Sequence, residues 1–156
     1  MNNLEDLKQA LLTLNSEDAF RPRFNNDHWR MLAPYLTRQE VRAGEMLIKQ
    51  GDRDRTMFLL ERGSLHVFVS GGPPGASRIA ILRAGSVVGE PGLFHDGPRM
   101  ANVEAMMPCV VWALLGQRLE EMVQRIPLVA YEFVRAAGTV MSARMRANMS
   151  RHVPLP

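Results

Sequence analysis

The 156-residue sequence is long enough for one domain with a full hydrophobic core, and its 46% hydrophobic and 22% charged residues are typical of a globular protein. The formal net charge is only +3 and the arginines are scattered, so charge alone does not indicate a nucleic-acid partner. Because no apolar run approaches the roughly 18 residues of a membrane span and the acidic N-terminus lacks a signal-peptide pattern, we expect a cytoplasmic protein without membrane contact.

Residues 1–36 have the hydrophobic spacing of amphipathic helices. Leucines recur at helical intervals over residues 4–14, which predicts a first helix. Asn25 is a residue type that caps helix N-termini, so a second helix is expected to begin there. We interpret Trp29 and Leu32 as the side chains that this second helix packs into the core.

Residues 37–115 change to the alternating pattern of short strands. Strands with a turn about every 8 to 12 residues are typical of a β-barrel or β-sandwich. The run 70–77 is rich in Gly, Pro and Ser and predicts a flexible hairpin loop; it is not a Walker-type phosphate loop, because no Lys follows its glycines. The predicted strand segments are 39–42, 46–48, 56–60, 64–69, 79–82, 85–88, 101–105 and 109–115.

The stretch 89–101 holds an acid and an arginine in a turn-rich loop. The carboxylate of Glu90 can accept hydrogen bonds from hydroxyl groups, and the guanidinium of Arg99 can hold a phosphate with two parallel donors. Pro91 suits the first position of a short helix whose N-terminus would face an anion, and Gly92 has no Cβ to obstruct a ligand. We therefore expect a site for one small polar ligand; a surface ion pair is the alternative.

Two further helices are predicted after the strands. The first covers 117–125, and Pro127 suits the first turn of a long helix over 128–151. We interpret the basic residues near its end, Arg144 among them, as a solvated helix face rather than a DNA contact. The apolar stripe of the long helix comprises Val129, Phe133, Ala137, Val140, Met141 and Met145.

No motif for metal binding or catalysis stands out. The four histidines are far apart in the sequence, and none has a His or Cys partner at ligand spacing. Cys109 is the single cysteine, which excludes a disulfide within the chain and a four-cysteine iron–sulfur cluster, and its apolar neighbours indicate a core residue. Because no Gly-x-Ser-x-Gly nucleophile motif is present, we expect neither an enzyme nor a resident cofactor or metal.

These features together resemble the cyclic nucleotide-binding domain family. The stretch 89–101 is similar to the family's phosphate-binding cassette, which reads Phe-Gly-Glu-x-Ala-Leu, a loop, and Pro-Arg-x-Ala. Gly44, Gly51 and Gly63 occupy the expected turns of its β-roll, and the resemblance covers about 41–115. It implies an α+β, mainly β, fold: an eight-stranded antiparallel β-roll of the double-stranded β-helix or jelly-roll type, flanked by N-terminal helices and two C-terminal helices.

The resemblance also implies a single domain and roles for individual residues. The domain would comprise an N-terminal helical segment (1–36), the roll (37–115) with its cassette (87–103), and the C-terminal helices (116–151). Gly89 and Glu90 would bind the ribose, whereas Arg99 and the amides of Gly92 and Met100 would bind the cyclic phosphate. Pocket contacts would come from Val88, Leu93, Ala101 and Asn102. From their spacing of three or four residues along the long helix, Thr139, Ser142 and Arg146 could reach the base if that helix folds over the pocket; solvent exposure of all three is the alternative.

The implied function is a sensory or regulatory module that binds a cyclic nucleotide and signals through rearrangement of its C-terminal helix. In the family, a residue without a hydroxyl after the cassette Arg accompanies several cAMP binders, so Met100 favours cAMP over cGMP. Whether a cyclic dinucleotide fits stays open. The alternative is a ligand-free interaction or scaffold protein that kept the fold. It is motivated by Val88, Gly92 and Asn102, where the family usually has an aromatic residue, Ala, and Ser or Thr.

The expected partners are the nucleotide, an unidentified effector protein and, through the long helix, a second copy of the chain. The resemblance implies that the long helix covers the ligand and pairs between subunits; packing on its own barrel is the alternative. Pro127 provides a hinge at which this helix can change direction. The transcription-factor branch of this family binds DNA through a further helix-turn-helix module. We expect no direct DNA binding, because no such module is predicted after the long helix in this sequence.

Overall fold

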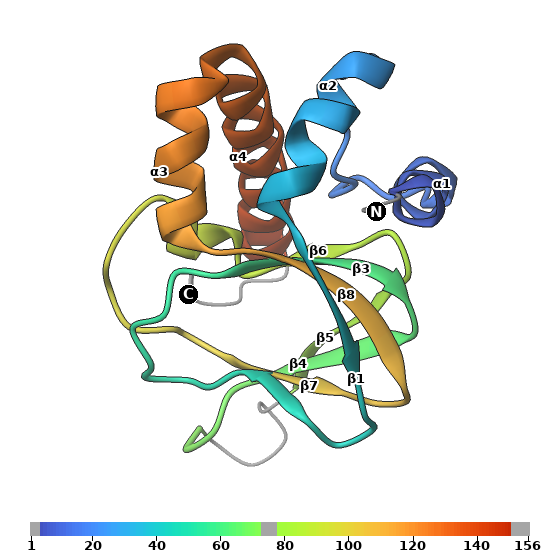
Figure 1. The fold of residues 1–156 in the computed structure, drawn as a ribbon. Helices are drawn as coiled ribbons and strands as arrows, with labels where there is room; N and C mark the ends of the chain where they lie inside the picture. Colours follow the sequence, from blue (N-terminus) through green and yellow to red (C-terminus); the bar gives the residue numbers. More distant parts are fainter. Residues whose placement is uncertain (1–3, 73–77, 151–156) are drawn as a thin grey trace.

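Two four-stranded antiparallel sheets pack into a roll, with the α-helices above it (Figure 1). The structure is a computed structural model that describes residues 4–72 and 78–150. One sheet has the strand order β1-β8-β3-β6 and the other has the order β2-β7-β4-β5. The strands are β1 (Thr37–Val41), β2 (Met46–Ile48), β3 (Met57–Arg62), β4 (Ser64–Phe68), β5 (Arg78–Arg83), β6 (Val87–Val88), β7 (Asn102–Ala105) and β8 (Cys109–Leu114).

The predicted fold class, a mainly β protein built on an antiparallel roll with flanking helices, is confirmed. Each predicted strand segment is present, and its ends differ from the prediction by at most two residues. Short strands between turns are recognisable in the sequence because the side chains of a half-buried strand alternate between core and solvent. Part of the loop predicted at 70–77, residues 73–77, lies outside the described residues.

Strands β3 and β8 are buried on both faces, which explains their almost continuous apolar sequences. They pair in antiparallel register, with Phe58 opposite Ala113 and Leu59 opposite Trp112. Successive side chains point to opposite faces, so Phe58 packs inside the roll whereas Leu59 and Trp112 pack beneath the helices. Cys109 is a buried core residue, as its apolar neighbours indicate. The sheet β1-β8-β3-β6 thus lies between the helices and the second sheet (Figure 1).

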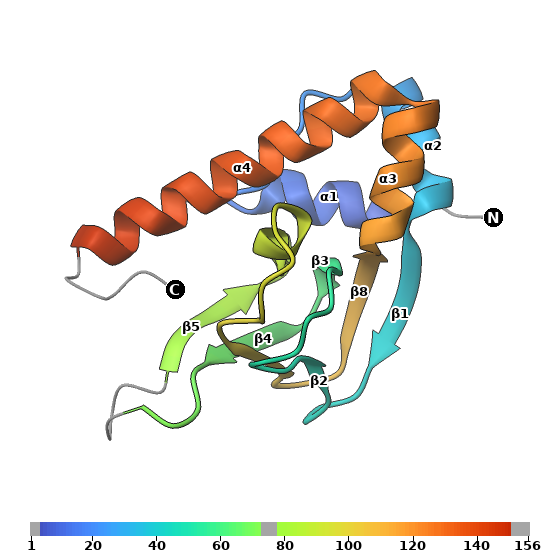
Figure 2. The same cartoon turned by 90° about the vertical axis from the view of Figure 1, so that its left-hand side faces the viewer.

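The helices gather on one side of the roll (Figure 2). The side chain of Asn25 accepts a hydrogen bond from the His28 N–H at 2.8 Å, so the second helix begins with the cap expected from its sequence. None of the helices in the described part of the chain is long and apolar enough to cross a membrane. The helices are α1 (Glu5–Thr13), α2 (Asn26–Leu32), η1 (Ala33–Tyr35), η2 (Glu90–Leu93), α3 (Gly116–Arg125) and α4 (Pro127–Ser150).

Candidate functional site

Gly89 makes the turn that carries the chain from β6 into η2. Its φ is +85°, in the left-handed region that glycine tolerates. A Cβ at this position would lie 2.7 Å from the carbonyl oxygen of Thr56, so the turn also lies directly against the residue that precedes β3. Glu90 follows as the first residue of η2 and is only 4% exposed. The local sequence therefore places a carboxylate inside the protein at the end of β6.

The two carboxylate oxygens of Glu90 have different surroundings. Oε1 accepts a hydrogen bond from Nη1 of Arg144 at 2.9 Å. Oε2 is buried and has no hydrogen-bond partner among the described residues. A buried acceptor without a donor costs about 1–3 kcal/mol, and more when the group is charged. Oε2 is therefore a buried acceptor that the described residues leave without a donor.

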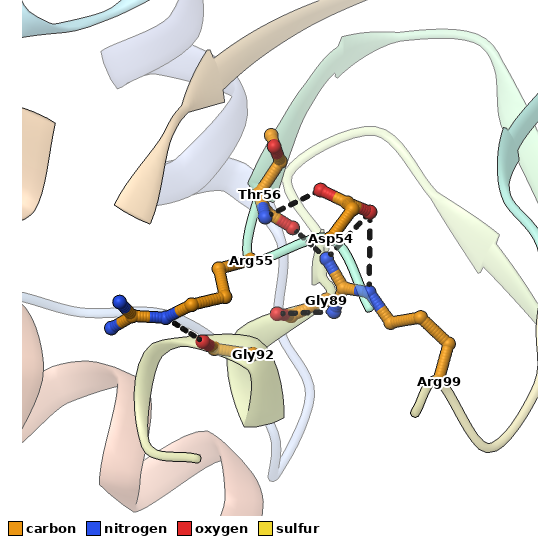
Figure 3. Close-up of polar contacts among 6 residues, drawn as sticks. All are labelled: Asp54, Arg55, Thr56, Gly89, Gly92 and Arg99. Carbon is orange, nitrogen blue, oxygen red and sulfur yellow. Dashed lines mark hydrogen bonds and ion pairs between the residues drawn. The ribbon is translucent and has the colours of Figure 1, made fainter. Parts of the chain in front are cut away.

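The guanidinium of Arg99 is buried and is held by several acceptors (Figure 3). Nε and Nη2 donate to Oδ2 of Asp54 at 3.3 and 3.2 Å, and Nη1 donates to the Gly89 carbonyl at 3.0 Å. Nη2 also donates to the Thr56 carbonyl. These contacts engage four of the five N–H donors of an arginine side chain, so one donor on Nη1 is left for a further acceptor.

Asp54 balances the charge of Arg99. Partial burial acts to raise the pKa of Asp54, but hydrogen bonds within the Asp54–Thr56 turn and the charge of Arg99 outweigh burial and lower this pKa below its ordinary value. Asp54 is therefore ionised at neutral pH, and it holds the guanidinium in one orientation. An arginine that is already ordered loses less side-chain entropy when a phosphate binds.

Gly92 provides the space that the Arg99 guanidinium occupies. A Cβ on Gly92 would lie 2.8 Å from Nη1 of Arg99. The Gly92 N–H donates to the Gly89 carbonyl at 3.1 Å within η2, and the Gly92 carbonyl accepts a hydrogen bond from Nε of Arg55 at 3.2 Å (Figure 3). In this structure, the space left by the absence of a Cβ on Gly92 is therefore occupied by the side chain of Arg99.

Arg144 of α4 connects the cassette to the N-terminal part of the chain. Besides Glu90, its guanidinium contacts the Val87 carbonyl through Nη2 at 2.7 Å and Oδ2 of Asp18 through Nε at 2.9 Å. The prediction that Arg144 belongs to a solvated helix face is wrong, because its guanidinium donates hydrogen bonds to the carboxylates of Asp18 and Glu90 and to the Val87 carbonyl. A signal was available in the sequence, since the buried positions 133, 137 and 140 of α4 continue at 144 with helical spacing.

Residues 38–126 match the family model of the cyclic nucleotide-binding domain. The chain belongs to the cyclic nucleotide-binding domain family. The match includes β1 from its second residue, the strands β2 to β8, the segment η2 and all of α3, and therefore contains both Glu90 and Arg99. It excludes Asp18 and Arg144, which lie on either side of the matched residues.

Two relatives are longer proteins. The cAMP-dependent protein kinase regulatory subunit of Blastocladiella emersonii is 32% identical over 90 residues, which cover 58% of this chain and 22% of that protein. The Acetyltransferase Pat of Mycolicibacterium smegmatis is 36% identical over 127 residues, which cover 75% of this chain and 37% of that protein. The chain therefore spans well under half the length of either relative.

A solved structure shows the same fold over almost the whole chain. The crystal structure of a cyclic nucleotide-binding domain from Methylobacillus flagellatus KT has a TM-score of 0.81 with this chain. The alignment covers 95% of this chain and 81% of that chain, at 21% sequence identity. The N-terminal and C-terminal helices are thus part of a known arrangement around this roll.

Three residues expected in the nucleotide pocket are buried near the cassette. Val88 packs inside the roll, whereas Leu93 packs in the cluster beneath the helices. Asn102 is 6% exposed, and its Oδ1 accepts a hydrogen bond from the Gln50 N–H at 2.9 Å. Its amide nitrogen donates to Oγ of Ser70 at 2.9 Å. Asn102 therefore joins the ends of β2, β4 and β7.

The other expected pocket residues are more exposed. Ala101 is partly buried, and Met100, next to the cassette arginine, is 53% exposed. Thr139, Ser142 and Arg146 are exposed on α4, and the Thr139 hydroxyl donates to a carbonyl of its own helix at 3.1 Å. Arg144 of α4, which the sequence did not single out, makes hydrogen bonds to Glu90 and to the Val87 carbonyl of the cassette.

Proposed function

We propose that this chain is a regulatory module, not an enzyme, and that it binds a cyclic nucleotide with cAMP preferred over cGMP. The observation that carries the proposal is the buried Oε2 of Glu90, which has no donor in the described structure. A ribose 2′-hydroxyl would supply that donor. Arg99 is bonded to the carbonyl of Gly89, the residue before Glu90, so a cyclic phosphate bound there would meet a fixed positive charge.

The phosphate would bind mainly through Arg99. The remaining Nη1 donor of Arg99 and the backbone N–H of Met100, the next residue, would both point to the same anion. The Gly92 N–H is engaged by the Gly89 carbonyl within η2, so its use for phosphate would require η2 to open. Met100 has no hydroxyl, and the Blastocladiella emersonii relative is the regulatory subunit of a cAMP-dependent protein kinase, which together support cAMP as the ligand.

Signalling would use α4. Arg144 extends from α4 to Glu90, so a nucleotide that binds Glu90 also changes the surroundings of α4. A ligand shifts only those conformations for which it has different affinities. In our proposal the helix closes over the bound nucleotide, and Thr139, Ser142 and Arg146 then approach the base. The hinge for this movement would lie at Pro127, where α4 begins directly after α3.

A second copy of the chain is the partner that we propose for α4. Leu128, Tyr131, Met145 and Met149 are 80%, 67%, 47% and 61% exposed. They lie at the first two and last two a and d positions of one heptad register, so one face of α4 carries an exposed apolar pair at each end that could pack against a second helix. Tyr131→Glu should weaken such a dimer. Sedimentation velocity over a range of concentrations tests this proposal, and a monomer at every concentration would refute it.

Thermal unfolding with cAMP, cGMP and 5′-AMP tests the proposed function. A ligand present at about 100 times its dissociation constant stabilises the folded state by about 2.7 kcal/mol. We expect cAMP to raise the Tm most, cGMP less, and the non-cyclic 5′-AMP hardly at all. A shift with neither cyclic nucleotide at millimolar concentration would favour the ligand-free interaction protein instead.

A further inference from the structure

A chain of polar contacts runs from the N-terminal segment to the carboxylate of Glu90. The hydroxyl of Ser16 donates to Oδ1 of Asp18 at 2.8 Å. Oδ2 of Asp18 accepts from Nε of Arg144 at 2.9 Å, and Nη1 of Arg144 donates to Oε1 of Glu90 at 2.9 Å. The exposed fractions of the Asp18, Arg144 and Glu90 side chains are 30%, 24% and 5%, so the contacts become more buried toward Glu90.

Asp18 and Arg144 are both charged in this arrangement. Burial acts to lower the pKa of Arg144, but the charges of Glu90 and Asp18 outweigh burial and raise this pKa. Burial acts to raise the pKa of Asp18, but hydrogen bonds from Ser16 and Arg144 outweigh burial and lower it. The guanidinium is therefore a permanent cation between two acidic side chains, and it is not a group that titrates in the physiological range.

The geometry separates the Arg144 contact from the proposed ribose contact. Arg144 binds Glu90 through one oxygen, Oε1, and leaves Oε2 without a donor. The guanidinium cannot easily rotate toward Oε2, because Nη2 is bonded to the Val87 carbonyl and Nε is bonded to Asp18. A hydroxyl on Oε2 and the guanidinium on Oε1 would therefore bind the same carboxylate at the same time.

We propose that Arg144, itself held by Asp18, is a positioning residue for ribose recognition. It fixes the carboxylate of Glu90 so that Oε2 accepts the ribose 2′-hydroxyl. Because Arg144 belongs to α4, the affinity for that hydroxyl then depends on the position of α4 relative to the cassette. This inference rests on the proposed function, because it assigns Glu90 to a ribose. It differs from a blocking role, in which Arg144 would occupy the place of the ribose.

The test compares cAMP with 2′-deoxy-cAMP, which lacks the hydroxyl in question. Calorimetric titration of the full chain should show that Arg144→Gln binds cAMP about tenfold more weakly, the size of one lost charge-assisted hydrogen bond. The same variant should bind 2′-deoxy-cAMP as well as the unmodified protein does. Asp18→Asn, a milder change, should shift the cAMP affinity in the same direction by a smaller factor. Arg125→Gln, on the exposed end of α3, is the matched control and should change neither affinity.

Three results would overturn the inference. Tighter cAMP binding by Arg144→Gln would mean that Arg144 blocks the ribose site. Equal losses for cAMP and 2′-deoxy-cAMP would mean that Arg144 only supports the fold. A further loss when Arg144→Gln is added to Glu90→Gln would mean that Arg144 acts independently of Glu90. If the unmodified protein binds neither cAMP nor cGMP, the proposed function itself fails, which is a different outcome from these three.

Discussion

The guanidinium of Arg99 lies over the backbone of Gly92, where a Cβ would come within 2.8 Å of Nη1. Asp54 and the Gly89 carbonyl hold the guanidinium in this place. Gly92→Ala should therefore force Arg99 out of its contacts and cost about 1–3 kcal/mol, the usual penalty of overpacking. Urea unfolding measures this loss.

Gly138→Ala is the control, since a Cβ on this helical glycine meets no atom within 4 Å. This substitution should stabilise the protein by about 0.5–1 kcal/mol. Equal stability of Gly92→Ala and the unmodified protein would show that Arg99 moves freely.

Gly89 and Gly44 provide a second matched pair. Both have a positive φ, +85° and +88°, so an alanine at either position is strained by about 1–2 kcal/mol. A Cβ on Gly89 would also meet the Thr56 carbonyl oxygen at 2.7 Å, whereas a Cβ on Gly44 meets nothing within 4 Å. Gly89→Ala should therefore lose more stability than Gly44→Ala in the same unfolding experiment. A smaller or equal loss would contradict the close packing of the cassette on β3.

The Asp54–Arg99 pair predicts a loss of stability in acid. The pKa of Asp54 is lowered from 3.8 in the folded state, so the contribution of this carboxylate is fully present above pH 3.8. The contribution is lost as the pH falls through the lower, folded-state pKa. Asp54→Asn should be less stable than the unmodified protein at neutral pH, and the two should converge in acid. Urea unfolding at a series of pH values tests this, and a difference that does not change with pH would argue against the ion pair.

Helix α4 should become more protected when the nucleotide binds. If α4 closes over the ligand, the backbone amides of residues 128–146 exchange more slowly with cAMP than without it. Hydrogen exchange measured by mass spectrometry tests this, with residues 5–13 of α1 as an internal reference. Protection confined to residues 89–101 would mean that the cassette binds the nucleotide without any response of the helix.

The roll and the cassette were predictable because their signals are local. Strand alternation and glycine turns need only neighbouring residues, and Glu90 and Arg99 lie within one loop. The boundaries of β2 were predicted without error, and those of α3 differ by one residue at one end.

The contacts of Arg144 were not predictable in the same way. They join α4 to Asp18 and Glu90, residues that are distant in the sequence and become neighbours only when helices and roll pack together. The spacing of the buried stripe places position 144 on the inner face of α4. An arginine near the end of a helix is nevertheless usually interpreted as a solvated residue, because its long side chain can carry the charge to water. The choice of Met145 as the next stripe residue failed for this reason, and this methionine is 47% exposed.

Calorimetric titration with cAMP, of the unmodified protein and of Arg99→Ala, tests the central claim most directly. Arg99 is the residue that we assign to the phosphate, and a charge-assisted hydrogen bond contributes about 1.5–3 kcal/mol. We predict that the unmodified protein binds cAMP and that Arg99→Ala binds it at least about tenfold more weakly. Arg42→Ala, an exposed arginine in the turn after β1, should bind as the unmodified protein does. Equal affinities of Arg99→Ala and the unmodified protein, or no heat of cAMP binding by either, would contradict the claim that Arg99 and Glu90 form a cyclic nucleotide site.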